Sequence, residues 1–130
     1  MVIPEIKSKI LCVDDDPNSL ELLKALLTPK FNVMTLSSAK EIISVLHSFK
    51  PDVILLDMLM PGAGGVEACD MLNNDPLGEK VPIIVISALD KNIDKLAVYK
   101  KGIVDYLVKP ITKDVLITHL EKILQSRYPE

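Results

Sequence analysis

The stretch KILCVDDDP, residues 9–17, decides the fold of this chain. It begins with a mostly apolar run of five residues, which is too short for a helix and fits a buried strand. Asp14, Asp15 and Asp16 follow side by side, although adjacent like charges repel one another. Asp16 precedes Pro17, which is the pattern of a helix N-cap with proline at the first helical position. Asp14 and Asp15 are therefore predicted to lie at the end of a strand, where a cation can bind them.

The same alternation of strand and helix is predicted along the rest of the chain. The strands are predicted at residues 9–13, 31–36, 53–57, 81–87 and 105–108. The helices are predicted to begin at Pro17, after a capping box at 38–41, after the glycine loop at 62–65, near Asp90 and after Thr112. Strands that are apolar on both faces, with helices between them, indicate an α/β fold with a parallel sheet covered on both sides.

The composition fits a single globular domain over residues 1–130. Hydrophobic residues make up 48% and charged residues 25%, which is enough for a core and too apolar for a disordered chain. The net charge of −3 gives no general attraction to nucleic acid. No apolar run approaches the roughly 18 residues of a membrane span, and the N-terminal residues lack the pattern of a secretory signal. Cys12 and Cys69 are predicted to be reduced thiols, so we expect a cytoplasmic protein. From the net charge and the lack of an apolar span, we expect it to bind neither nucleic acid nor membrane directly.

Polar residues also follow the other predicted strands. Asp57 ends the third strand, Ser87 ends the fourth, and Lys109 follows the fifth. In an open α/β sheet, ligands bind outside the carboxyl ends of the strands, where the strand order reverses. If the strand order is 2-1-3-4-5, Asp57 lies beside the acids of the first strand, and such carboxylates suit a hard divalent ion such as Mg²⁺. Lys109 and Ser87 would add a positive charge and a hydroxyl donor, which together favour a phosphoryl group on Asp57.

Four motifs together resemble the response regulator receiver domain, the phosphoacceptor module of two-component signalling. They are LCVDDDP, PDVILLDMLMPGAGG, PIIVISA and GIVDYLVKP, and the resemblance covers nearly the whole chain. It implies a flavodoxin-like fold, a doubly wound (βα)5 three-layer sandwich whose parallel sheet has the strand order 2-1-3-4-5. It also implies that residues 1–130 form one receiver domain.

The resemblance assigns roles to individual acids. Asp57 is expected to be the phosphoacceptor. Mg²⁺ is the expected cofactor, and Asp14, Asp15 and Asp57 are expected to bind it. The backbone carbonyl of Leu59 is expected to be a further ligand of the metal.

The resemblance also assigns roles to three residues at the ends of the last two strands. Ser87 is expected to be the switch hydroxyl that forms a hydrogen bond with the phosphoryl group. Lys109 is expected to pair with the phosphoryl group, and the Lys109–Pro110 peptide bond is expected to be cis. Tyr106 is expected to be the aromatic residue that changes rotamer on activation.

The function that the resemblance implies is a phosphorylation-activated signalling switch and not a turnover enzyme. A sensor histidine kinase or a phosphotransfer protein would supply the phosphoryl group. A separate effector protein, or an output domain outside this chain, would receive the signal.

Two other functions remain open. An aspartate-nucleophile small phosphatase commonly has D-x-D-x-[TV] after its first strand. Asp14 and Asp16 have this spacing, with Asn18 at the last position. A phosphorylation-independent docking module is the second alternative, and it would be expected to lack an acid or the lysine of the site.

Overall fold

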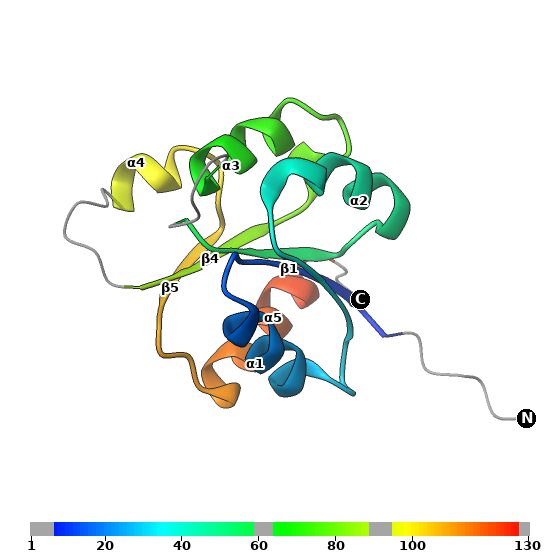
Figure 1. Cartoon of the computed structure of the whole chain (residues 1–130), viewed down its shortest axis with the longest axis vertical. Coiled ribbons are helices and arrows are strands. Elements are labelled where there is room, and N and C mark those ends of the chain that lie inside the picture. Colours follow the sequence, from blue (N-terminus) through cyan, green and yellow to red (C-terminus); the bar gives the residue numbers. More distant parts are fainter. Residues whose placement is uncertain (1–6, 59–63, 89–94, 128–130) are drawn as a thin grey trace, which may run out of the picture.

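The computed structural model describes residues 7–58, 64–88 and 95–127 of the 130-residue chain. These residues form one sheet of five parallel strands in the order β2-β1-β3-β4-β5 (Figure 1). The strands are β1 (Lys9–Val13), β2 (Asn32–Leu36), β3 (Val53–Leu56), β4 (Ile83–Ser87) and β5 (Asp105–Val108). The predicted strand order is confirmed.

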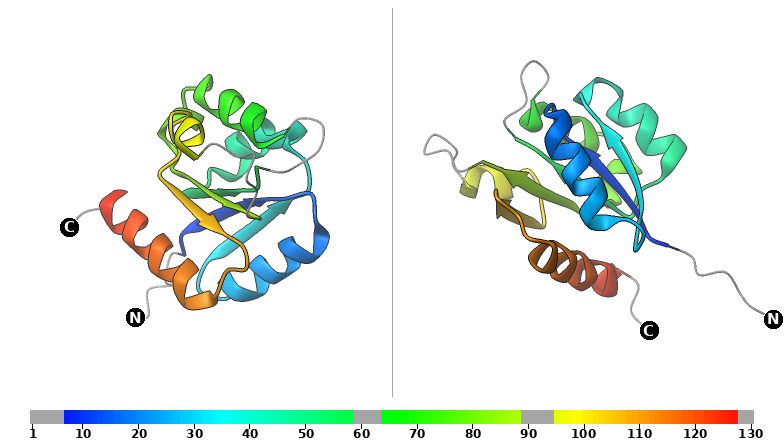
Figure 2. Two further views of the ribbon diagram at one scale, coloured as in Figure 1. Left: turned by 90° about the vertical axis from the view of Figure 1, so that its left-hand side faces the viewer. Right: turned by 60° about the horizontal axis from the view of Figure 1, so that its bottom comes forward.

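Helices cover both faces of the sheet. The α-helices are α1 (Pro17–Leu27), α2 (Ile42–Phe49), α3 (Gly65–Asn73), α4 (Lys95–Tyr99) and α5 (Lys113–Arg127), and two 3-10 turns are η1 (Ala39–Glu41) and η2 (Gly78–Lys80). α1 and α5 lie on one face of the sheet, and α2, α3 and α4 lie on the other (Figures 1 and 2). The three-layer sandwich is therefore confirmed. Within the described ranges, none of these helices combines the length and the apolar character that crossing a bilayer requires.

The sheet separates two hydrophobic cores. On β3, Ile54 and Leu56 belong to the core formed with α2 and α3, whereas Val53 and Leu55 belong to the core formed with α1 and α5. All four side chains are at most 1% exposed. β3 also has a hydrogen-bonded neighbour on each side, β1 and β4. Asp57, which follows β3 directly, is therefore attached to a strand that is enclosed on every side.

Capping residues set the starts of the first helices. Asp16 caps α1 as predicted, because its Oδ1 accepts a hydrogen bond from the Asn18 N–H at 3.0 Å. The predicted capping box at 38–41 does not cap an α-helix directly. Ser38 Oγ accepts a hydrogen bond at 3.2 Å from a backbone N–H two residues later, and it caps the 3-10 turn η1. The α-helix α2 begins only at Ile42.

Two predicted boundaries differ from the observed ones by two residues, the start of β4 and the end of α4. β4 begins at Ile83 and not at residue 81, and Pro82, which precedes it, has no backbone N–H to donate to a neighbouring strand. α4 lies within the helix predicted from about residue 90 to 101, and it ends at Tyr99. A turn that ends at Gly102 follows it, and Gly102 has a φ of 90°. A positive φ of this size favours glycine. Residues 89–94 lie outside the described residues.

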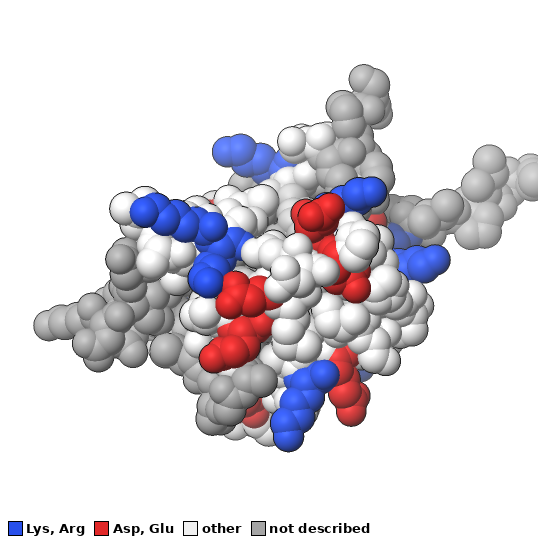
Figure 3. All heavy atoms as spheres, turned by 90° about the horizontal axis from the view of Figure 1, so that it is seen from above, with Lys and Arg blue, Asp and Glu red and all other residues white. Residues whose placement is uncertain are grey.

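Acidic and basic side chains are interspersed on the face formed by α2, α3 and α4 (Figure 3). Lys101 pairs with Asp70 of α3 at 3.0 Å, and His47 of α2 bonds Asp75 at 2.7 Å. On the part of this face that the structure describes, acidic and basic side chains are therefore mixed (Figure 3).

Candidate functional site

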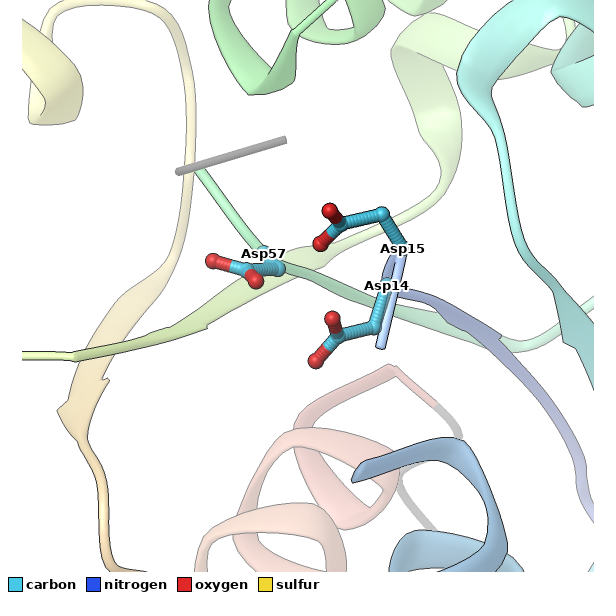
Figure 4. Close-up of side chains that lie close together, drawn as sticks. All are labelled: Asp14, Asp15 and Asp57. Atoms are coloured by element: carbon cyan, nitrogen blue, oxygen red, sulfur yellow. The ribbon is translucent and has the colours of Figure 1, made fainter. Parts of the chain in front are cut away.

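Three aspartates meet where β1 and β3 end. Val13 and Leu56 are partners in the parallel register, so the residues that follow them, Asp14 and Asp57, are also neighbours. The backbone continues this pairing, because the Asp57 N–H donates to the Val13 carbonyl at 3.0 Å. Asp14, Asp15 and Asp57 each offer a carboxylate oxygen, and these oxygens lie within 4.8 Å of one another (Figure 4). Asp14 and Asp57 are only 2% and 7% exposed, whereas Asp15 is exposed.

Lys109 brings one positive charge to these acids. Its Nζ lies 2.7 Å from Asp14 Oδ2 and 3.6 Å from Asp57 Oδ2. The Lys109 N–H donates to the Ser87 carbonyl at 2.9 Å, and this bond extends the β4–β5 pairing to the edge of the site. Burial lowers the pKa of Lys109, but hydrogen bonds and charge interactions with Asp14 and Asp57 outweigh it, so the pKa lies above its ordinary value.

Ser87 approaches the opposite oxygen of Asp57. Its side chain is fully buried at the end of β4, and its Oγ donates a hydrogen bond to Asp57 Oδ1 at 3.0 Å. Asp57 therefore has a hydroxyl donor at one carboxylate oxygen and an ammonium near the other. A buried carboxylate that is held by fixed polar groups in this way is a suitable nucleophile for group transfer.

The profile of one protein family, the response regulator receiver domain, matches residues 10–121. The chain belongs to this family. The receiver domain is the signalling module of two-component response regulators, which agrees with the resemblance found in the motifs.

This receiver domain is similar to relatives over nearly its whole length. It is 34% identical over 123 residues to protein RcaC of Microchaete diplosiphon, which covers 94% of this chain and 19% of RcaC. It is 30% identical over 118 residues to protein PilH of Pseudomonas aeruginosa, which covers 90% of this chain and 98% of PilH. A solved two-component response regulator from Clostridium difficile has a TM-score of 0.84 at 25% identity, over 94% of this chain and 99% of that one. This chain thus spans about a fifth of RcaC and nearly all of PilH.

The donor set of this receiver domain fits Mg²⁺. All three side chains offer oxygen atoms, which a hard divalent cation prefers. Three carboxylates against the single ammonium of Lys109 leave this cluster with a net negative charge. Asp14, Asp15 and Asp57 can therefore hold a divalent cation. The predicted ligand carbonyl of Leu59 lies outside the described residues.

The last strand of the receiver domain carries the other two predicted features. Tyr106 lies on β5, is partly buried, and packs against the core formed with α2 and α3. The Lys109–Pro110 peptide bond is cis, as the resemblance implies. Tyr106 and Lys109 are thus placed on one edge of the sheet, next to the strand that ends in Ser87.

The structure adds Ser19, which the sequence analysis did not single out. Lys109 Nζ donates to Ser19 Oγ at 3.3 Å, and Ser19 Oγ donates to Asp16 Oδ2 at 3.2 Å. Asp16 therefore does more than cap α1. Ser19 lies three residues after the capping aspartate. This position in the first turn of α1 is the one feature of the sequence that could have indicated a contact with Asp16.

Gly65 is a second addition. A Cβ atom at this position would lie 2.5 Å from Met58 Cα and 2.9 Å from the Asp57 carbonyl oxygen, closer than real Cβ contacts. The start of α3 can therefore approach the residues after β3 only because Gly65 lacks a side chain. The sequence predicts a glycine loop here but carries no sign of this close approach.

Proposed function

We propose that this receiver domain is a phosphorylation-activated switch in which Asp57 accepts the phosphoryl group. The observation that carries the proposal is the setting of Asp57. It is a buried carboxylate with the Ser87 hydroxyl at 3.0 Å on one oxygen and the Lys109 ammonium at 3.6 Å from the other. Phosphoryl transfer requires mainly positioning and charge neutralisation, and both are available from these groups.

The proposed donor is the phosphohistidine of a sensor histidine kinase or of a phosphotransfer protein. An Asp57 carboxylate oxygen attacks the phosphorus and forms an O–P bond. The N–P bond of the donor breaks, and the released histidine nitrogen takes up a proton from solvent. Asp14, Asp15 and Asp57 would hold Mg²⁺, which supplies neutralising charge to the phosphoryl oxygens when it is bound.

Ser87 and Tyr106 would convert phosphorylation into a change of surface. The Ser87 hydroxyl now donates to Asp57 Oδ1, and after phosphorylation it would donate to a phosphoryl oxygen instead. Its movement would leave space that Tyr106 fills by turning inward. This differential contact would shift the population between two states of the surface around β5.

The recipient of the signal is proposed to be an effector, either as a separate protein or as a further domain. RcaC and PilH illustrate the two possibilities, because the matched region is 19% of RcaC and 98% of PilH. We propose that residues 1–130 form one receiver domain, that it works in the cytoplasm, and that it does not bind nucleic acid or membrane directly.

The site assignment is tested by chemical phosphorylation. Acetyl phosphate and Mg²⁺ should add one acid-stable, base-labile phosphoryl group, detected by mass spectrometry, and Asp57→Asn should abolish it. Asp70→Asn is the matched control, because Asp70 is an exposed acid of α3 and its variant should be labelled like the parent. Labelling that survives Asp57→Asn would contradict the proposal.

The switch is tested separately with Ser87→Ala. This variant should still accept a phosphoryl group on Asp57, because the nucleophile and Lys109 are unchanged. It should lose most of the change in the Tyr106 NMR signals that phosphorylation causes in the parent. An unaltered Tyr106 response in the variant would count against the proposed coupling.

The two alternative functions predict different results. A small phosphatase would release many phosphate molecules per protein from a phosphomonoester, but Asp16, the second acid of its motif, is engaged in capping α1 and in bonding Ser19. If the protein were a phosphorylation-independent docking module, the parent and Asp57→Asn would bind the partner with the same affinity under phosphorylating conditions. The switch predicts neither result.

A further inference from the structure

A second set of polar contacts reaches the site from α1. Ser19 lies in the first turn of this helix, and its hydroxyl donates its single proton to Asp16 Oδ2 at 3.2 Å. A hydroxyl that donates its proton in one direction presents its lone pairs in another. Lys109 Nζ donates to these lone pairs at 3.3 Å. Asp16 therefore orients the Ser19 hydroxyl as an acceptor for the ammonium.

The ammonium of Lys109 is held from two sides. It donates to Asp14 Oδ2 at 2.7 Å and to Ser19 Oγ at 3.3 Å, and Asp57 Oδ2 lies 3.6 Å away. An ammonium has three N–H donors, so the two bonds leave one donor for the side of Asp57. Lysine has a long flexible stem, and one contact alone would leave the ammonium free to rotate and swing.

The surroundings partly shield the contact between Lys109 and Ser19 from solvent. Ser19 and Lys109 line a cavity of about 350 Å³ whose other walls are leucine, isoleucine and proline side chains. Hydrogen bonds in such apolar surroundings are stronger than in open water. The Lys109 side chain is 28% exposed, so the ammonium is shielded but not closed off.

We propose that Ser19 is a positioning residue for phosphoryl transfer, which acts by holding the Lys109 ammonium beside Asp57. This inference rests on the proposed function, because it concerns the same reaction. A donor that is already aligned does not have to be reorganised when charge develops on the transferred group. Ser19 does not touch the reacting atoms, and it acts only through Lys109.

The test compares Ser19→Ala with the parent. The variant removes the Ser19 acceptor for Lys109 but keeps the bond from the Asn18 N–H to Asp16 Oδ1, so the cap of α1 stays intact. Ser19→Thr keeps a hydroxyl and should restore most of the parent rate. Ser48→Ala is the matched control, because Ser48 lies on α2 and its hydroxyl donates to the Val45 carbonyl.

Two measurements distinguish positioning from a structural role. Phosphorylation of Asp57 by acetyl phosphate at fixed Mg²⁺ should be about fivefold slower in Ser19→Ala, the effect of losing one hydrogen bond to an ammonium at a partly exposed site. In the unphosphorylated protein, NMR of the Lys109 side chain should show increased motion of the ammonium. Ser48→Ala should match the parent in both measurements.

The outcomes separate this inference from the proposed function. Equal or faster labelling of Ser19→Ala, with unchanged Lys109 signals, would overturn the role of Ser19 and leave Asp57 as the phosphoacceptor. Slower labelling that Ser19→Thr fails to restore would also overturn it. A parent protein that is not labelled on Asp57 would overturn the proposed function, and the inference with it.

Discussion

Replacing Lys109 with glutamine should lower the free energy of unfolding of the metal-free protein by about 2 kcal/mol. The change removes the ammonium that lies 2.7 Å from Asp14 Oδ2, and Asp14 is only 2% exposed. A buried carboxylate that loses its partner retains the cost of its own desolvation.

The magnitude follows from the burial of the two partners. Removing one partner of a fully buried ion pair costs about 3–5 kcal/mol. The Lys109 side chain is 28% exposed, and Asp14 Oδ1 keeps its hydrogen bond from the Asp16 N–H at 3.0 Å. Solvent screening and this remaining bond reduce the expected loss to about 2 kcal/mol, or roughly 8 °C in Tm for a domain of this size.

Lys101→Gln is the matched control for this variant. It breaks a pair with a similar distance, 3.0 Å to Asp70, but the two side chains are 38% and 50% exposed. An exposed pair of this kind contributes at most about 1 kcal/mol. The assay is chemical denaturation of the parent and both variants without metal. Equal losses for Lys109→Gln and Lys101→Gln would refute the reasoning from burial.

The pH dependence gives an independent check. The folded-state pKa of Lys109 lies above its ordinary value of 10.5, so the ion pair stabilises fully below pH 10.5 and its contribution is lost as the pH rises through the folded-state value. The difference between parent and Lys109→Gln should be constant between about pH 6 and 9 and should shrink above 10.5. Adding Mg²⁺ should also reduce the difference, because a bound cation neutralises the same carboxylates.

Three further changes have defined outcomes. Asp15→Ala should weaken Mg²⁺ binding in a titration and should raise the Tm of the metal-free protein by relieving repulsion, and a lower Tm would contradict a strained acid cluster. Gly65→Ala should destabilise the protein by about 1–3 kcal/mol in denaturant, because its Cβ would lie 2.5 Å from Met58 Cα, and an unchanged midpoint would contradict this close approach. Asp75→Ala should lower the Tm at neutral pH, because the hydrogen bond from His47 holds the pKa of Asp75 below its ordinary 3.8. That difference should decrease as the pH falls below 3.8, because protonation removes the part that depends on the charged carboxylate, and a constant difference down to about pH 2 would contradict it.

The strands and helices themselves could be predicted because the signals that set them are local. Each strand is a short apolar run, and each is followed by a helix, which a parallel sheet requires. The neighbouring positions of Asp14 and Asp57 follow from that order, because both residues end strands that pair directly. The resemblance supplied the order itself, since periodicity alone does not choose among parallel arrangements.

The contacts of Ser19 could not be predicted in the same way. They depend on how α1 is rotated against the sheet and on how far the Lys109 side chain reaches across 90 residues of sequence separation. The clearance at Gly65 likewise depends on how α3 packs against Met58. The pair of His47 and Asp75 joins residues that are 28 positions apart, and no local pattern marks it.

The position of β3 has a consequence for local opening of the protein. β3 is paired on both sides and all four of its residues are buried, whereas β5 has one buried residue and, among the described strands, pairs only with β4 at the edge of the sheet. Amide protons in enclosed strands exchange with solvent through nearly global unfolding, and those at an edge exchange through smaller openings. We therefore expect the backbone that carries Asp57 to exchange slowly and the strand that leads to Lys109 to exchange faster. The Asp57 carboxylate would then stay in place through local openings that reach β5.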